Sequence, residues 1–284
     1  MLSYQHIYHA GNFADVQKHS LLVYLLDALV KGDAPLHVLD THAGRGFYDL
    51  SSPEAQKTGE HAFGVTPLWQ ARKRQSGIIT DYLDVIARYN DDNRTIRRYP
   101  GSARITRDLI RPTDTLVAAE RHPGEFTHLA ESFADADPRT TDLFQDDGLL
   151  GLSDAAPPRM HRGLAIIDPS YEIKTEYTAV PRTLAAAWRN WPQSSALLWY
   201  PILPAGGHKM LLETLAGAKL PNTLVSEIYL STPPKANFRM EGSGIVIVNC
   251  PWDKTTMIDL SEEIAAALTA TKTCGTVSAD VFSL

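Results

Sequence analysis

Residues 36–46 read LHVLDTHAGRG, a short apolar run followed by a turn that contains Gly44 and Gly46. Two glycines one residue apart permit a tight turn and let a ligand approach the backbone at the carboxyl edge of a sheet. Similar β-type runs recur along the chain at residues 115–120, 141–145, 164–168, 196–200, 223–228 and 244–248. Several of them are almost continuously apolar, which is typical of strands buried on both faces.

Helical patterns, such as those at residues 177–188 and 209–215, separate these runs. The alternation predicts an α/β fold with a mostly parallel sheet of seven strands and helices on both faces. The segment from residue 47 to residue 98 lacks a convincing buried strand and shows helical spacing between residues 81 and 89. We therefore expect a main domain of residues 1–46 and 99–284, with residues 47–98 as a small helical insertion after the first strand.

Composition excludes several classes of protein. The 284 residues are 44% hydrophobic, which is enough for a large core and excludes a disordered or fibrous chain. The net charge of -6 excludes a generally basic, nucleic-acid-coating surface. A local basic patch remains, formed by Arg72, Lys73, Arg74, Arg94, Arg97, Arg98, Arg104, Arg107 and Arg111. Composition does not decide between a solvated helical face and a surface that tracks phosphates.

The expected compartment is the cytoplasm. Cys250 and Cys274 are the only cysteines, which is no disulfide framework and suits a reducing environment. The N-terminus has neither the basic nor the apolar region of a signal peptide. The longest apolar stretch, residues 21–30, is interrupted by Asp27 and is too short to cross a bilayer. We expect no membrane partner.

Acidic residues follow the predicted strands in an order that favours a nucleotide-like ligand. A carboxylate at the end of the second strand, Glu120, is suited to accept hydrogen bonds from ribose hydroxyls. Asp147 and Gly148, after the third strand, are suited to hold an adenine, and Ser102 adds a hydroxyl. Each acid alone is more often a cap or a loop residue. A nicotinamide cofactor is disfavoured, because Asp49 stands where its fingerprint requires a third glycine.

The sequence Asp168-Pro169-Ser170-Tyr171 follows another buried strand. This pattern suits chemistry on the exocyclic amino group of a base. The Asp168 carboxylate and the Pro169 carbonyl would each accept one N–H, and Tyr171 would stack on an extruded base. The alternative is a proline-containing turn. A similar sequence at residues 249–252 is expected to be structural, because an antiparallel strand there would end at the opposite edge of the sheet.

A metal site is not expected. His6, His9 and His19 cluster near the N-terminus, but no acidic or thiol residue accompanies them at the spacing of a zinc site.

The sequence resembles one bacterial family nearly from end to end. The resemblance rests on Met1 to Tyr4, His9 to Asn12, Ala14 to Val16, Lys18-His19, residues 40–44, Tyr99 to Ser102, Glu120 with His122-Pro123, Asp147-Gly148 and the Asp-Pro-x-Tyr motif at 168–171. This is the RlmJ family of 23S ribosomal RNA adenine-N6 methyltransferases. The resemblance implies a class I, Rossmann-like methyltransferase with a helical insertion, which uses S-adenosylmethionine to modify one adenine of 23S rRNA.

The same resemblance implies roles for individual residues. The cofactor pocket would be lined by His19, His42, Gly44, Ser102, Glu120, Asp147, Gly148 and Asp168. Asp168, Pro169 and Tyr171 would form the catalytic motif, and Tyr4, His6 and Lys18 would lie at the substrate RNA. The expected partner is 23S rRNA in a protein-free or early precursor state, and the expected protein is a monomer without a metal ion.

One position departs from the family's usual motif, Asp-Pro-Pro-Tyr. Ser170 replaces the second proline, so this residue has no locked φ and gains an N–H. Two other functions stay open. One is a DNA adenine-N6 methyltransferase, since the motif reads the amino group and not the sugar. The other is a nucleic-acid-binding protein with reduced or lost catalysis, in line with a described role of the family in using external DNA as a nutrient.

Overall fold

The computed structural model describes residues 4–91, 95–154, 162–236 and 238–284. Its main sheet has eight strands in the order β10-β8-β9-β7-β6-β1-β4-β5, and β2 and β3 form a small separate sheet. The strands are β1 (His37–Asp40), β2 (Phe47–Asp49), β3 (Arg98–Pro100), β4 (Thr115–Ala119), β5 (Thr141–Phe144), β6 (Gly163–Ile167), β7 (Ser194–Ile202), β8 (Leu224–Leu230), β9 (Gly242–Val248) and β10 (Val277–Ser283).

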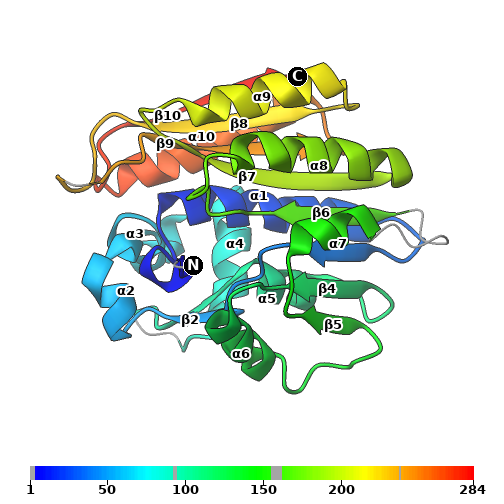
Figure 1. The fold of residues 1–284 in the computed structure, drawn as a ribbon. Helices are drawn as coiled ribbons and strands as arrows, with labels where there is room; N and C mark the ends of the chain where they lie inside the picture. The colour runs from blue at the N-terminus through cyan, green and yellow to red at the C-terminus, as the bar shows by residue number, and fades with distance from the viewer. Residues whose placement is uncertain (1–3, 92–94, 155–161, 237) are drawn as a thin grey trace.

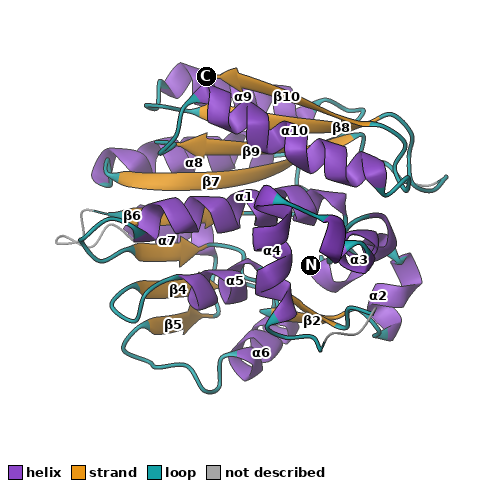
Figure 2. Ribbon diagram, turned by 180° about the vertical axis from the view of Figure 1, so that it is seen from behind, coloured by secondary structure: helices purple, strands orange, loops and turns teal. Residues whose placement is uncertain are grey.

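Helices cover both faces of the main sheet. The α-helices are α1 (Phe13–Val30), α2 (Pro53–Thr58), α3 (Val65–Gln70), α4 (Gly77–Ala87), α5 (Ser102–Leu109), α6 (Pro123–Ser132), α7 (Gly148–Asp154), α8 (Glu176–Asn190), α9 (Gly207–Ala218) and α10 (Lys254–Ala270). Short 3-10 helices are η1 (His6–Tyr8), η2 (Glu60–Phe63) and η3 (Arg72–Arg74). Figure 1 shows α7, α8 and α9 over one face, and Figure 2 shows α1, α4, α5 and α10 over the other. No helix among the described residues has the length and apolar character needed to span a membrane.

The strand directions define a mostly parallel sheet with an antiparallel part at one end. Strands β5, β4, β1, β6 and β7 are mutually parallel. Strand β9 lies between β7 and β8 and runs antiparallel to both. The fold is thus α/β and Rossmann-like, as predicted. The parallel strands place their carboxyl ends at one edge, which is where open α/β sheets bind ligands.

The predicted number of strands, seven, is wrong by one. All seven predicted runs form strands, and β10 adds an eighth, which pairs antiparallel with β8 at the edge of the sheet. This strand alternates between buried Val277 and more exposed residues such as Ser278, so it forms no continuous apolar run. An edge strand that is covered on one face carries a weaker hydrophobic signal than a central strand does.

Residues 47–98 contain α2, α3 and α4, and the segment begins with β2 and ends at the first residue of β3. The helical spacing at residues 81–89 largely coincides with α4. Strands β2 and β3 pair antiparallel, from Phe47 opposite Pro100 to Asp49 opposite Arg98. Buried side chains of α4, including Ile79 and Tyr82, belong to the same hydrophobic core as those of α1. The division of the chain into two domains stays a prediction.

Helix α1 carries polar residues into the core. Asn12 caps its N-terminus, and the Asn12 side chain accepts hydrogen bonds from the backbone N–H groups of Ala14 and Asp15. Asp15, Lys18 and His19 are buried on this helix together with a run of leucines. Buried charges need partners, because desolvation disfavours them strongly. One such partner, Asp168, which pairs with Lys18, directly follows β6 at the carboxyl edge of the sheet.

Candidate active site

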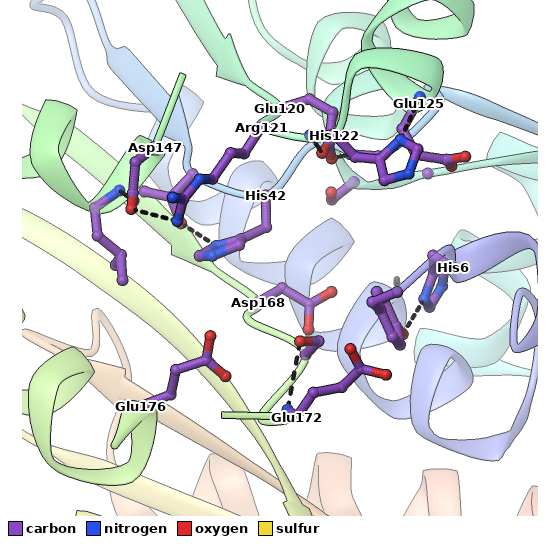
Figure 3. A pocket seen from close by; sticks show the side chains of 18 of the residues that line it. His6, His42, Glu120, Arg121, His122, Glu125, Asp147, Asp168, Glu172 and Glu176 are labelled. Carbon is purple, nitrogen blue, oxygen red and sulfur yellow. Dashed lines mark hydrogen bonds and ion pairs between the residues drawn. The ribbon is translucent and has the colours of Figure 1, made fainter. Parts of the chain in front are cut away.

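A cavity lies at the carboxyl ends of β1, β4 and β6, beside the turn that follows β5. Figure 3 shows Asp168 between His42 and Glu172, with the segment from Glu120 to Glu125 across the cavity. Eleven of the predicted site residues line this cavity: Tyr4, His6, Lys18, His19, His42, Gly44, Ser102, Glu120, Asp147, Gly148 and Asp168. Segments far apart in sequence thus meet at the edge that the strand pattern indicated.

Two glycines leave room for close backbone contacts around this cavity. Gly44 has φ +59°, and a Cβ there would lie 2.0 Å from the hydroxyl of Tyr48. A Cβ on Gly148 would lie 2.2 Å from the carbonyl oxygen of Thr41. The first turn of α7 therefore packs directly on the turn after β1. Only glycine fits this close approach without a backbone shift.

The Glu120 carboxylate links two turns of the cavity wall. Its oxygens accept hydrogen bonds from the backbone N–H groups of Gly44 (3.0 Å) and His122 (2.6 Å). Burial raises the pKa of Glu120, and these backbone donors partly offset that effect. Each carboxylate oxygen has a further lone pair, so Glu120 remains able to accept hydrogen bonds from a ligand.

Glu120→Ala is expected to weaken binding of S-adenosylhomocysteine, the demethylated form of the predicted cofactor, about tenfold or more. Hydrogen bonds to charged groups contribute about 1.5–3 kcal/mol, and about 1.4 kcal/mol corresponds to a factor of ten. Calorimetric titration measures the effect. An unchanged dissociation constant would show that Glu120 only supports the turns at Gly44 and His122.

Burial shifts the pKa values of the ionisable groups around β1. Burial raises the pKa of Asp40 to about 7, although Ser102 Oγ and the His42 backbone N–H donate hydrogen bonds to it. Burial lowers the pKa of His19 to about 3 and that of His42 to about 4. The two imidazoles therefore act as neutral hydrogen-bonding groups. His19 Nδ1 lies 2.7 Å from the Tyr99 hydroxyl.

Asp168 lies at one end of a chain of ion pairs and hydrogen bonds. Its Oδ2 lies 2.5 Å from Lys18 Nζ, and Lys18 Nζ lies 2.8 Å from Asp15 Oδ1. His6 Nε2 lies 2.9 Å from Asp15 Oδ2, and the Tyr4 hydroxyl lies 2.9 Å from His6 Nδ1. The predicted RNA-side residues are thus connected to the predicted catalytic carboxylate. No three His, Cys, Asp or Glu side chains gather into a metal-binding group in the described part of the chain.

Pro169 and Tyr171 lie differently from the other predicted residues. Both are buried and neither lines the cavity, whereas Ser170 and Glu172 do. The Tyr171 hydroxyl donates a hydrogen bond to the carbonyl of Trp199, and its ring packs 4.6 Å from that of Tyr177. The backbone at Tyr171 has φ +53°, which is unusual for a residue other than glycine. This arrangement does not support the predicted stacking of a base on Tyr171.

Several residues that line the cavity or contact its lining were not predicted. Arg45 forms a bidentate ion pair with buried Glu125, at 2.8 Å for each bond, and Gln5 Nε2 donates to the same carboxylate. Glu125 lines the cavity, and so does Glu172, which is exposed. Arg45 lies between the two glycines of the turn, so its position was a usable signal. Nothing in the local sequence marks Glu125, whose partner is 80 residues away.

Most of the basic patch has structural partners. Arg104 contacts Asp108 and the Ser132 carbonyl, Arg107 donates to the Thr140 carbonyl, and Arg111 pairs with Asp114. Arg97 is different, because its side chain is 75% exposed and its ion pair with Asp49 is long, at 3.5 Å. Arg98 stacks over the Phe47 ring. Arg94 lies outside the described residues.

Residues 249–252, whose sequence is similar to that of the motif at 168–171, lie away from the cavity. They follow β9, which is antiparallel to its neighbours, and Cys250 and Trp252 line a separate surface pocket with Asn222 and Lys254. Their expected structural character agrees with this position.

Comparison with known proteins identifies the family. A family model described as "Ribosomal RNA large subunit methyltransferase D, RlmJ" matches residues 33–280. The chain belongs to the RlmJ family. "Ribosomal RNA large subunit methyltransferase J" of Escherichia coli (strain K12) is 36% identical over 89% of this chain and 88% of its own. The Haemophilus influenzae protein of the same name is 34% identical over 95% of this chain and 94% of its own.

A solved structure supports the same overall fold. Protein LPL1258 from Legionella pneumophila is 32% identical, covers 97% of this chain and 98% of its own, and gives a TM-score of 0.85. The resemblance noted from the sequence motifs is therefore confirmed at the level of the RlmJ family.

Proposed function

We propose that this protein methylates the exocyclic N6 amino group of an adenine in 23S ribosomal RNA, with S-adenosylmethionine as the methyl donor. Membership of the RlmJ family supports a large-subunit rRNA methyltransferase. The site supports the chemistry at an amino group. Asp168 follows a fully buried strand and faces a cavity that also holds Glu120 and Asp147.

The residues of the cavity fit the proposed cofactor. Gly44 and Gly148 both line the cavity, and neither places a side chain between its backbone and a bound nucleoside. Glu120 is suited to accept from ribose hydroxyls, and Asp147 from an adenine amino group. His19, His42 and Ser102 add neutral polar contacts. When bound, S-adenosylmethionine supplies a methyl group that its sulfonium already activates, so catalysis depends mainly on alignment.

Asp168 would orient the target amino group. The lone pair of an adenine N6 is delocalised into the ring, which makes it a poor nucleophile. A hydrogen bond from N6 to Asp168 would localise that lone pair toward the methyl group. Methyl transfer would leave positive charge on N6, and the Asp168 carboxylate would stabilise that charge. The excess N6 proton leaves to solvent.

The observation that carries the proposal is the convergence of Asp168, Glu120 and Asp147 on one cavity at the carboxyl edge of the sheet. The test is methyl incorporation into protein-free 23S rRNA taken from cells that lack the protein, followed by mapping of N6-methyladenine. Duplex DNA is assayed in parallel as the comparison substrate. Preference for DNA would favour a DNA methyltransferase, and cofactor binding without transfer to either substrate would favour a binding protein that has lost catalysis.

Arg97 and Arg98, in the basic patch, are expected to contribute to RNA binding. Replacing Arg97 and Arg98 together by glutamine should weaken RNA binding and make its dependence on salt shallower, by about 0.7–0.9 in the slope for each lost phosphate contact. Binding isotherms at several salt concentrations measure this slope. An unchanged slope would show that these arginines are only solvated surface.

The proposed setting of the reaction is the bacterial cytoplasm, with the enzyme as a monomer. The proposed substrate is rRNA that is free of protein or still an early precursor, because an extruded adenine must reach a cavity lined by residues from several segments.

A further inference from the structure

Asp15 is a buried carboxylate in direct contact with the machinery of the proposed site, although it does not line the cavity. Its residue is only 2% exposed. Oδ2 accepts a hydrogen bond from the Gly11 backbone N–H at 2.8 Å and lies 2.9 Å from His6 Nε2. Oδ1 lies 2.8 Å from Lys18 Nζ. Asp15 Oδ2 therefore binds the N-terminal segment at His6 and Gly11, and Oδ1 binds the Lys18 ammonium.

Lys18 lies between two carboxylates. Its ammonium contacts Asp15 on one side and Asp168 on the other, and it is 3% exposed. Burial opposes the charged form of Lys18, but Asp15 and Asp168 raise its pKa above the ordinary value. The lysine is therefore a permanent cation near neutral pH. Burial likewise opposes the charged form of Asp15, yet His6 and Lys18 hold its pKa well below the usual range.

Asp15, Lys18 and Asp168 form a triad, and the net charge of this triad affects the proposed reaction. Two carboxylates and one ammonium leave a net charge of -1 beside the cavity. With Asp15 neutral, Lys18 and Asp168 would form a simple pair with no net charge. That pair would be a weaker hydrogen-bond acceptor and would stabilise a developing positive charge less, since electrostatic effects are strong in a buried site.

We infer that Asp15 is a positioning residue that shares the Lys18 ammonium with Asp168 and so preserves the negative charge of Asp168 for the target amino group. This inference rests on the proposed function. Among the described residues, Lys18 is the one hydrogen-bonding partner found for the Asp168 carboxylate, and it binds Oδ2. Oδ1 is then the oxygen that meets an adenine N–H. Asp15 touches neither substrate nor cofactor and acts through Lys18.

Asp15→Asn tests the inference, because asparagine keeps the shape and one oxygen for the Gly11 N–H but removes the charge. The matched control is Glu60→Gln. Glu60 is another buried carboxylate of the N-terminal region, bound to His9 and Asn12, and it neither contacts Lys18 nor lines the cavity. Both variants are assayed for kcat on protein-free 23S rRNA, KM for S-adenosylmethionine, affinity for S-adenosylhomocysteine and Tm.

We expect Asp15→Asn to lower kcat about tenfold to a hundredfold, with KM and the affinity for S-adenosylhomocysteine within about twofold of wild type. Glu60→Gln should keep kcat within about threefold, because it leaves the triad intact. A kcat within twofold for Asp15→Asn would overturn the inference. Equal losses in the two variants, or a parallel loss of cofactor affinity, would also overturn it, because they indicate a structural role.

The wild-type enzyme separates this inference from the proposed function. If wild type methylates adenine N6 and Asp15→Asn does so equally well, only the role of Asp15 fails. If wild type binds S-adenosylhomocysteine but transfers no methyl group to adenine N6, the proposed function fails, and the inference fails with it.

Discussion

Asp168→Ala is expected to lower kcat for methyl transfer to 23S rRNA by about 10²–10³-fold or more, the cost of losing one preorganised electrostatic group at a reacting centre. The substitution removes the carboxylate that orients the N6 amino group and stabilises its developing charge. The fold should survive, because Lys18 keeps its ion pair with Asp15 and no buried ammonium is left without a partner. Single-turnover kinetics with saturating cofactor measure the effect on the chemical step.

The matched control for this variant is Asp142→Ala, which removes an exposed carboxylate of β5 that does not line the cavity. Its kcat should stay within about twofold of wild type, as is usual for surface changes. Near-normal turnover of Asp168→Ala with an unchanged Tm would refute the assignment of the catalytic carboxylate.

Gly148→Ala is expected to weaken binding of S-adenosylhomocysteine about tenfold to a hundredfold. The new Cβ would lie 2.2 Å from the backbone carbonyl oxygen of Thr41, so the turn after β1 and the start of α7 must move apart. Overpacking of this kind costs about 1–3 kcal/mol. Both displaced segments line the cavity, and therefore the cost falls on the cofactor site.

Gly151→Ala is the control for this prediction. Gly151 lies on the same helix, α7, and a Cβ there meets nothing within 4 Å. The affinity of the Gly151→Ala variant for S-adenosylhomocysteine should equal that of wild type, because the new Cβ displaces no neighbouring atom. Alanine is also a better helix former than glycine, so the helix should not be weakened. Equal affinities for the two variants in calorimetric titration would show that the cofactor does not depend on the close approach at Gly148.

The residues after the buried strands could be predicted because their place follows from topology. Parallel strands end at the same edge of a sheet, so Glu120, Asp147 and Asp168 had to lie near one another once their strands were recognised. The glycine turn at residues 44–46 follows the first of these strands and lies at the same edge. Continuous apolar runs marked the strands themselves.

The roles of Asp15 and Glu125 could not be predicted from local sequence. Both lie in the first turn of a helix, where an acidic residue is ordinary because it interacts favourably with the helix dipole. Their significance comes from tertiary partners, Lys18 with Asp168 for the first and Arg45 for the second. Strand β10 was not predicted for a related reason, because what defines it is its pairing with β8 and not a pattern in its own sequence.

Tyr171 shows the limit of reading a motif by residue type. An aromatic residue after an Asp-Pro pair suggests a platform for a base, but its hydroxyl donates to the Trp199 carbonyl and its ring packs in the core beside Tyr177. The left-handed backbone at this position is a feature of the loop that no spacing rule indicates. In this arrangement, Asp168 and Ser170 are the motif residues that face the cavity.

The most direct measurement is a crystal structure of the protein with S-adenosylhomocysteine and adenosine bound together. The proposed mechanism predicts the homocysteine derivative against Gly44, Glu120 and Gly148, and the adenosine N6 within about 3 Å of an Asp168 carboxylate oxygen. A cofactor bound away from the ends of β1 and β6, or an adenosine amino group that does not reach Asp168, would contradict it.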